Sequence, residues 1–577
     1  MTQHDHVLMV CWPAVGHARP MLDYAAALLN KDPALTITFV CSKMQIALLQ
    51  RLAISEHLSS ERFGNRLRLF GTGAHAKEVL EEFSNREYAK NASSSKPTND
   101  PSDDRPEPEV ILTMQAATHV CEQFAQIFPT ILANHDLFDK EDGSLLLPAC
   151  LAGSPSSIIV NWMLPGIVEI VRKHTASLKM VTFFDNASTF VLRMLGPRSI
   201  GGFGGIERLW SQYCNSNPEV DRNNGVLKEK LLGRRWTGGF RIPGSRMSTI
   251  EEVENAALAK DWLLSLPLTP SLIEIQKLVD ASHTILINTH LAVEQRELDY
   301  LRLVLPFKII GIIGPVMFSC FVQKGERMAA KLLKEQHAAS NSQSVPNTPP
   351  RTPPRSPKME EDKEIGDSKA QSANDVENFL ASSPASSVVY ISFGTMFRPQ
   401  PAQLVEMLET FVSEMRLNPD FRLLFTFGGS KDLVSSCPPA FSPRVSALES
   451  QLLASGRAML TNWVDQHLVL QHPAVGWFLS HGGWNSCQEA MLAGKPLLVL
   501  PFFGDQLYNA YLLESASVAF RIKTGAKMDI AEFVKTFEEG IACCRRTNEV
   551  GARLTRQAKL LKERLRQERA RGEVLFL

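Results

Sequence analysis

Short apolar runs alternate along the chain with longer amphipathic segments. Near the start, HVLMVCW (6–12) has the pattern of a buried strand, PMLDYAAALLN (20–30) that of a helix, and LTITFVC (35–41) that of a second strand. A strand, a helix and a strand in succession form a β-α-β unit, which implies a parallel sheet. The pattern therefore predicts an α/β protein.

The predicted strands fall into two series separated by a long polar stretch. The first series continues through RLRLFG (66–71), SIIVNW (157–162), KMVTFF (179–184) and HTILINT (283–289). The second consists of SVVYISFG (387–394), FRLLFTFG (421–428), AMLTNWV (458–464), VGWFLSH (475–481) and PLLVLPF (496–502). Two such series in a chain of 577 residues predict two doubly wound domains.

The stretch between the two series has a different composition. Residues 336–378 are polar and rich in proline and serine, so they cannot bury enough apolar surface to offset the entropy of ordering. The Thr-Pro and Ser-Pro pairs at Thr348, Thr352 and Ser356 fit either a tolerated spacer or phosphorylation sites. The expected organisation is an N-terminal domain over 1–317 with a disordered loop at about 86–109, a linker over 318–386 with its disordered insertion at about 336–378, a C-terminal domain over 387–550, and a C-terminal helix and tail over 551–577.

Charge and cysteine content narrow the class of partner. Lys+Arg and Asp+Glu both number 61, so no net field favours nucleic acid or an acidic membrane, and we expect a small-molecule partner. The ten cysteines are scattered without a C-x-x-C pair, which argues against a zinc site or a disulfide scaffold. The start of the chain lacks the features of a signal peptide, and no run reaches the roughly twenty apolar residues of a membrane helix. The expected location is the cytoplasm, with no membrane span.

Polar side chains are concentrated where the predicted strand VGWFLS ends. The residues HGGWNS (481–486) follow it and precede the predicted helix SCQEAMLAG. Ligands of doubly wound folds bind at the carboxyl ends of the strands, and a glycine-rich turn into a helix N-terminus suits a phosphate. Asn485 and Ser486 are also residue types that cap helices, which alone would explain those two positions but not the preceding His-Gly-Gly.

Neighbouring motifs stand at fixed distances from this loop: TNWVDQ (461–466), Glu489, GKP (494–496) and PFFGDQ (501–506). From Trp463 to Gln506 the segment resembles the plant secondary-product signature of family-one UDP-glycosyltransferases, which runs from a tryptophan to a glutamine over 44 positions. Outside this box, VGHARPML, ILINTHLAVEQREL (285–298), IGPV and SVVYISFGTM are similar to further segments of that family.

The resemblance implies the GT-B fold, in which two Rossmann-like domains face each other across a cleft. It also implies a UDP-sugar donor, bound mainly by the C-terminal domain. Trp463 would stack on the uracil ring, Val464 would bind its edge through the backbone, and Gln466 would lie near the ribose. Glu489 would accept hydrogen bonds from the ribose hydroxyls, as suits a carboxylate facing a diol. The diphosphate would be held by Thr395, His481, Gly483, Asn485 and Ser486, and the sugar hydroxyls by Trp484, Asp505 and Gln506.

Transfer with inversion requires a base for the acceptor hydroxyl, and a histidine is suited to that role. His17, expected in a loop directly after the first strand, matches the catalytic base of the family. The family supports this histidine with an aspartate, but the matching position here is Asn161, so either His17 has a weaker partner or another carboxylate such as Asp185 replaces the aspartate. No Asp-x-Asp pair is present, so we expect neither a metal nor any other cofactor.

The expected function is transfer of a sugar, by resemblance glucose, from a UDP-sugar to a hydroxyl of a lipophilic small molecule, in secondary metabolism or glycolipid synthesis. Two alternatives stay open: a catalytically reduced GT-B protein that only binds nucleotide sugar, and a transferase that uses another donor such as GDP-mannose. Candidate residues for a lipophilic acceptor pocket, each equally able to be core, are Trp12, Trp162, Met163, Phe183, Phe184 and Phe190.

Overall fold

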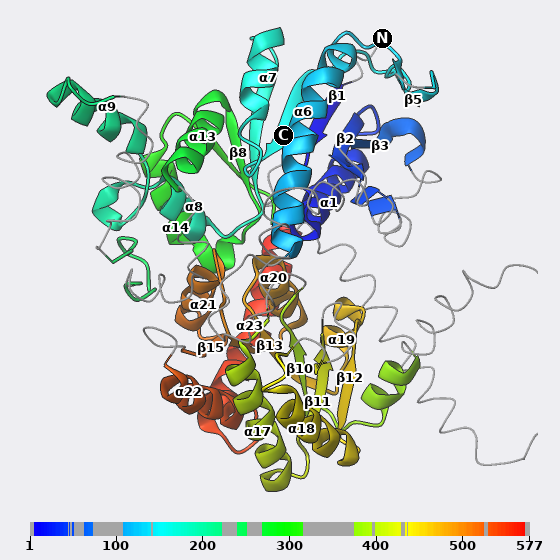
Figure 1. Cartoon of the computed structure of the whole chain (residues 1–577), viewed down its shortest axis with the longest axis vertical. Helices are drawn as coiled ribbons and strands as arrows, with labels where there is room; N and C mark the ends of the chain where they lie inside the picture. Colours follow the sequence, from blue (N-terminus) through cyan, green and yellow to red (C-terminus); the bar gives the residue numbers. More distant parts are fainter. Residues whose placement is uncertain are drawn as a thin grey trace, which may run out of the picture.

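The computed structural model contains two parallel β-sheets, one from each half of the chain (Figure 1). It describes residues 5–43, 45–46, 49–50, 63–72, 108–139, 142–221, 239–250, 268–314, 374–394, 398–427, 433–434, 437–523 and 529–571. The Thr-Pro and Ser-Pro pairs, most of the proposed insertion and nearly all of the loop predicted at about 86–109 therefore lie outside the described residues. So does Thr395.

The first sheet has seven strands in the order β3-β2-β1-β6-β7-β8-β9, and every neighbouring pair is parallel. Its strands are β1 (His6–Val10), β2 (Thr36–Ser42), β3 (Leu67–Thr72), β6 (Ser157–Asn161), β7 (Lys179–Phe184), β8 (Thr284–Ile287) and β9 (Ile309–Ile312). Its helices are α1 (Val15–Lys31), α6 (Pro108–Leu132), α7 (Ile167–His174), α8 (Ser188–Leu195), α9 (Ile206–Ser216), α13 (Leu268–Ala281) and α14 (Leu291–Val304). A short hairpin pairs β4 (Leu137–Phe138) with β5 (Leu145–Leu147).

The second sheet has six strands in the order β12-β11-β10-β13-β14-β15, again all parallel. The strands are β10 (Val388–Ser392), β11 (Arg422–Thr426), β12 (Ala458–Thr461), β13 (Val475–Ser480), β14 (Leu497–Val499) and β15 (Ala519–Arg521). The helices are α17 (Pro401–Leu417), α18 (Ser442–Ala454), α19 (Gln466–Gln471), α20 (Trp484–Ala493), α21 (Gln506–Ser515), α22 (Ile530–Cys543) and α23 (Glu549–Ala570).

Alternation along each strand explains why both sheets are covered on both faces. On β1, Met9 belongs to the core cluster that includes residues of α1, whereas Leu8 and Val10 belong to the cluster that includes Phe124 of α6. Successive side chains of a strand point to opposite faces, so a strand buried on both faces is apolar throughout. The uninterrupted apolar runs of the sequence are those of a parallel sheet.

The two halves are packed against each other through a shared core and through the last helix. One hydrophobic cluster contains Phe184 and Leu298 from the first half together with Trp484 and Tyr508 from the second. Helix α23, red in Figure 1, packs on α20 and α22 of its own half and on α14 of the other. The predicted fold class, two Rossmann-like sheets of the GT-B type, is confirmed in its architecture.

Two local predictions are wrong, and the capping alternative does not hold. Helix α1 begins at Val15, so His17 lies in its first turn and not in a loop. Helix α20 begins at Trp484, and its N-cap is Gly483 without a side-chain cap, so Asn485 and Ser486 lie inside the helix and do not cap it. Residues 374–378, expected to be disordered, lie in a helix whose Val376 is buried in the core.

Within the part of the chain that the structure describes, no helix is both long and apolar enough to cross a membrane.

Candidate active site

Both sheets reverse their strand order at one point, and the candidate site lies there. In the first sheet β1 lies between β2 and β6, and in the second β10 lies between β11 and β13. The connections on the two sides of such a point leave in opposite directions, which opens a crevice at the carboxyl ends of the strands. His17 follows β1 and Asn161 ends β6, while the loop of His481 follows β13. The topology thus brings the predicted residues to the two crevice edges.

His17 is paired with Asp185. Its Nδ1 lies 2.7 Å from Asp185 Oδ2, and only 5% of the Asp185 side chain is exposed. The other oxygen of the carboxylate, Oδ1, accepts a hydrogen bond of 2.9 Å from Nε1 of Trp162. The open question about the partner of His17 is therefore answered in favour of Asp185, which follows β7, the strand next to the one that ends in Asn161.

The pKa of His17 is raised above its ordinary value of 6.5. Burial by itself lowers this pKa, but the Asp185 carboxylate, the more distant charge of Asp505 and the Asn161 side chain together outweigh burial. The charged imidazolium is favoured by a nearby carboxylate, because opposite charges attract strongly where water is excluded. An imidazole held in this way can accept a proton and keep the resulting charge.

The turn between β13 and α20 requires its glycines. Gly482 has a φ of +83°, a conformation that L side chains rarely adopt. A Cβ on Gly483 would lie 2.4 Å from Nε2 of His481, and one on Gly394 would lie 3.1 Å from the same ring. Burial lowers the pKa of His481 to about 4, so the ring is neutral at neutral pH. The turn thus presents a helix N-terminus and a neutral imidazole, a suitable environment for an anion.

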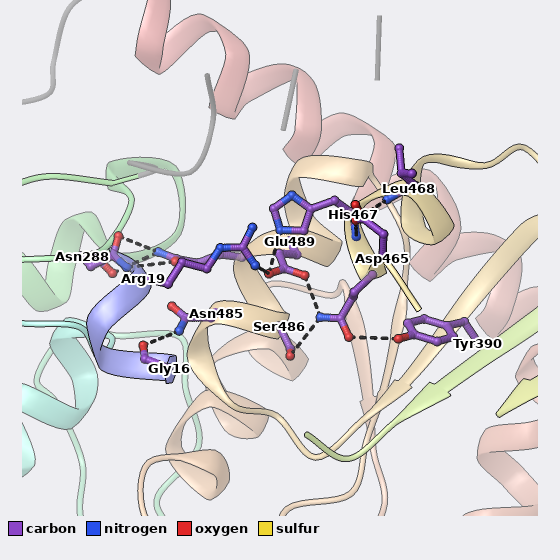
Figure 2. A network of polar contacts seen from close by, with 12 residues as sticks. Gly16, Arg19, Asn288, Tyr390, Asp465, His467, Leu468, Asn485, Ser486 and Glu489 are labelled. Atoms are coloured by element: carbon purple, nitrogen blue, oxygen red, sulfur yellow. Dashed lines mark hydrogen bonds and ion pairs between the residues drawn. The ribbon is translucent and has the colours of Figure 1, made fainter. Parts of the chain in front are cut away.

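Glu489 lies at the centre of a polar network on α19 and α20 (Figure 2). Its Oε2 accepts a hydrogen bond of 2.6 Å from Nε2 of Gln466, and its Oε1 lies 3.0 Å from Nε2 of His467. Gln466 also donates to Ser486 Oγ and accepts from the hydroxyl of Tyr390. Burial raises the pKa of Glu489, but its neighbours, led by His467, lower it to about 2. Three predicted donor residues, Gln466, Ser486 and Glu489, are therefore in direct contact.

Trp463 and Val464 differ in exposure. This difference is what is expected if Trp463 stacks on a nucleobase and the buried Val464 supports it. The Trp463 side chain is 72% exposed, whereas Val464 is 7% exposed and belongs to the core. An exposed indole beside a polar cleft has its ring face available for stacking on a base. A tryptophan packed in the core would not be exposed to this extent.

Asp505 and Gln506 stand at the start of α21 and have defined partners. Asp505 Oδ2 accepts from Nδ2 of Asn509 at 2.9 Å and from Nδ2 of Asn186 at 3.2 Å. Burial raises the pKa of Asp505, and these hydrogen bonds oppose that change. Gln506 Oε1 accepts from the backbone N–H groups of Phe502 and Phe503, which fixes the loop before the helix.

Trp484 contributes to the packing of the two halves. Its side chain is 3% exposed, and its indole N–H donates to the carbonyl oxygen of Asn288, in the loop after β8. The indole N–H is thus already used within the protein. A sugar hydroxyl could meet only the backbone of this residue.

Two further hydrogen bonds join the halves at the site. Nδ2 of Asn485 donates to the Gly16 carbonyl at 2.6 Å, which places the first turn of α20 beside that of α1 (Figure 2). The hydrogen bond from Asn186 to Asp505 places the loop after β7 beside the start of α21. The turn of α1 that carries His17 and the loop before α20 therefore meet where the two halves are in contact.

Three of the six candidates for an acceptor pocket are core residues. Phe183 and Phe184 are fully buried, and Trp162 is 7% exposed and stacks on Phe184. The other three, which are partly exposed, are Trp12, Met163 and Phe190. Among these three, Trp12 is the one whose ring contacts His17, with the two ring centroids 6.3 Å apart.

Sequence reasoning missed two residues of this site. Arg19 lies 3.8 Å from Glu489, and Asn186 bonds to Asp505. The proximity of Arg19 to His17 in the sequence is the one signal that could have indicated it. Among the described residues, no group of three His, Cys, Asp or Glu side chains could hold a metal ion.

Known proteins with a similar sequence match part of the chain. Residues 316–541 match the family described as UDP-glucoronosyl and UDP-glucosyl transferase. Relatives include flavonol 3-O-glucosyltransferase F3GT2 of Actinidia chinensis var. chinensis, 31% identical over 31% of this chain and 35% of that protein. UDP-glycosyltransferase 708G2 of Citrus unshiu is 36% identical over 25% of this chain and 30% of that protein. The chain thus spans about a third of the length of these curated relatives.

Solved structures resemble the chain over its whole length. Medicago truncatula UGT71G1, complexed with UDP-glucose, has a TM-score of 0.60 at 18% identity and covers 98% of this chain and 94% of its own. A Glycyrrhiza uralensis protein, UGT73P12, has a TM-score of 0.60 at 16% identity, covering 97% and 91%. The predicted resemblance is confirmed: residues 316–541 match the UDP-glycosyltransferase family, within a chain that has the two-sheet fold of these structures.

Proposed function

We propose that this protein is an inverting glycosyltransferase that moves a sugar from a UDP-sugar to a hydroxyl of a lipophilic small molecule. The observation that carries the proposal is the pairing of His17 with Asp185. The turn of α1 that bears His17 is held beside the start of α20, where the donor is expected to bind. A protein that only binds nucleotide sugar has no need of a base with a raised pKa at the mouth of its site.

The chemistry follows from the orientation of the imidazole. Because Nδ1 faces Asp185, Nε2 is left to meet the acceptor. Nε2 takes the hydroxyl proton while the acceptor oxygen forms a bond to the anomeric carbon of the sugar. The bond from that carbon to the diphosphate breaks, and its electron pair stays on the phosphate oxygen. Attack from the face opposite the leaving group inverts the anomeric centre.

The protein groups support the two charges that develop. Asp185 stabilises the imidazolium, since it lies 2.7 Å away in a buried setting. The N-terminus of α20 faces the departing diphosphate. We propose that no metal ion takes part, so that activity should survive EDTA.

The names of the relatives support a choice of substrates. Curated relatives are named as flavonol and anthocyanidin 3-O-glucosyltransferases, and one similar structure was solved with UDP-glucose. We therefore propose UDP-glucose as donor, with Asp505 and Gln506 at the sugar, and a phenol of flavonoid type as acceptor. Secondary metabolism in the cytoplasm is the setting that fits this reaction and the scattered cysteines of the sequence.

The donor is tested first, because this needs no knowledge of the acceptor. Thermal unfolding is measured with UDP, UDP-glucose, GDP and GDP-mannose at equal concentration. A ligand at one hundred times its Kd stabilises the folded state by about 2.7 kcal/mol. We expect stabilisation by the uridine nucleotides alone. Stabilisation by GDP ligands alone would overturn the donor assignment.

The reaction is then tested with UDP-glucose and a set of flavonols. We expect a β-glucoside from the α-linked donor, and we expect His17→Ala to abolish it without weakening UDP binding. His135→Ala, at an exposed histidine after α6, is the matched control and should retain activity. Binding of UDP-glucose without any transfer would favour the alternative of a catalytically reduced binding protein.

A further inference from the structure

Arg19 extends from the base-bearing half of the protein towards the donor site of the other half. It belongs to α1, the helix of His17, and its Nη1 lies 3.8 Å from Oε1 of Glu489 (Figure 2). The Arg19 side chain is 21% exposed and that of Glu489 is 5% exposed. A cation of the acceptor domain is thus held over the carboxylate that we assign to the ribose.

The contact is one that Arg19 can leave easily. Gln466 and His467 approach the same carboxylate more closely, at 2.6 Å and 3.0 Å. A separation of 3.8 Å is beyond hydrogen-bond length, so the pair is held by charge attraction alone. Ribose hydroxyls that bind to Glu489 would compete with Arg19 for it.

A phosphate group bound at the donor loop would need a positive partner near this position. The hydrogen bond from Asn485 to Gly16 holds the first turn of α1 beside the first turn of α20. Arg19 is one turn further along α1, and its guanidinium lies at Glu489, in the second turn of the helix whose N-terminus is expected to bind the diphosphate. Burial keeps His481 neutral, with a pKa of about 4, so the ring adds no charge there. Arg398, which lowers the pKa of His481, is a second described cation of this region.

We propose that Arg19 is a donor-binding residue that exchanges Glu489 for the diphosphate when a nucleotide enters. The ribose hydroxyls take the carboxylate, and the guanidinium, whose forked donors match phosphate oxygens, turns to the diphosphate. The inference rests on the proposed function, because it assumes a nucleotide diphosphate donor. It adds a residue of the acceptor domain to donor recognition, and it makes release of the cross-domain ion pair part of binding.

The test compares a nucleotide with its nucleoside. Titration calorimetry measures the affinity of UDP and of uridine for the wild type, Arg19→Met and Arg19→Lys. For Arg19→Met we expect UDP to bind about tenfold to a hundredfold more weakly, the effect of losing a hydrogen bond to a charged group. Uridine should bind as well as before or more tightly, since Glu489 no longer has a competing partner. Arg19→Lys should lie between the two for UDP, because it keeps the charge and loses the fork.

Arg302→Met is the control, since it removes an exposed arginine of α14 that pairs with Asp299 on the same helix. It should leave both affinities unchanged. Equal losses for UDP and uridine in Arg19→Met would mean that Arg19 supports the site only as a structural residue and would overturn the proposal, as would an unchanged affinity for UDP. A wild type that binds neither ligand, or prefers GDP, would instead refute the proposed donor, so the two failures are distinguishable.

Discussion

Nδ1 of His17 lies 2.7 Å from the Asp185 carboxylate, although the sequence pattern of the family places the partner of this histidine on a different strand. The carboxylate follows β7, and the position expected to hold it, at the end of β6, is occupied by Asn161. Since β6 and β7 are parallel neighbours, their carboxyl ends lie side by side at one edge of the sheet. A side chain from either strand can therefore reach the same imidazole.

The pH dependence of transfer should reflect this pairing. His17 must be neutral to accept a proton, so kcat/KM should rise with pH through an apparent pKa above 6.5. Asp185→Asn removes the charge that raises this pKa, so its profile should shift to lower pH while its maximal rate falls. This shift is tested by measuring kcat/KM against pH for the wild type and for Asp185→Asn. An unshifted profile in the variant would show that Asp185 does not raise the pKa of the group that titrates.

Moving the carboxylate back to β6 should restore part of the activity. Asp185→Asn alone should lower kcat by about a hundredfold to ten-thousandfold, because the imidazolium loses its stabilising charge. Adding Asn161→Asp places a carboxylate beside the same ring, whose pKa Asn161 already affects. Single-turnover rates of the single and double variants test this. A double variant no faster than Asp185→Asn would show that only the β7 position aligns the imidazole.

Glu294 holds the helix that follows the Asp185 loop. It is fully buried and accepts hydrogen bonds from the backbone N–H groups of Ser188 and Thr189 and from Thr189 Oγ1, at 2.7–2.8 Å. These are groups of the first turn of α8 that no residue of the helix can satisfy. Glu294→Ala should therefore lower the free energy of unfolding by about 3 kcal/mol or more and should also lower kcat, since Asp185 loses its support.

Urea unfolding and steady-state kinetics measure the two effects of Glu294→Ala. Asp299→Ala on the same helix is the control, because that side chain is 58% exposed and should change stability by about 0.5 kcal/mol or less. A loss in stability with unchanged kcat would show that the helix start can shift without moving Asp185.

Glu568 links the end of the chain to the other half of the molecule. Its two carboxylate oxygens, on α23, accept from the backbone N–H groups of Leu291 and Ala292 at the start of α14, at 2.8 Å and 3.1 Å. The N-cap of α14, His290, supplies no side-chain cap. Glu568→Ala should cost about 1–2 kcal/mol, as for other lost caps. Denaturant titration of this variant beside Glu563→Ala, an exposed glutamate of α23, checks the value, and equal midpoints would contradict it.

Much of the fold can be predicted from the sequence, because strands buried on both faces are uninterrupted apolar runs. The strand β6, for example, occupies 157–161 against a predicted 157–162. The short strands β9 and β15 were missed, since runs of three or four residues next to helices carry little periodicity. His17 is expected in a loop because the predicted helix begins at Pro20, whereas α1 begins at Val15.

The residues of the donor loop were predictable as a group because their spacing along the chain is fixed. The partners that cross the cleft were not. Contacts such as Arg19 with Glu489 or Asn186 with Asp505 depend on how the two halves are oriented, and no local pattern encodes that orientation. The same is true of Asp185, which becomes the partner of His17 only through the order of the strands in the sheet.

Among the tryptophans that the structure describes, Trp463 alone has an exposed indole, and the others are buried or partly buried. Indole emission depends on the surroundings of the ring, so this one side chain gives the protein an intrinsic optical reporter at the proposed donor site. A uracil stacked on the ring should quench the long-wavelength part of the emission, and Trp463→Phe should abolish that change. Arrival and departure of the nucleotide could then be followed in real time, without a label and before any acceptor is known.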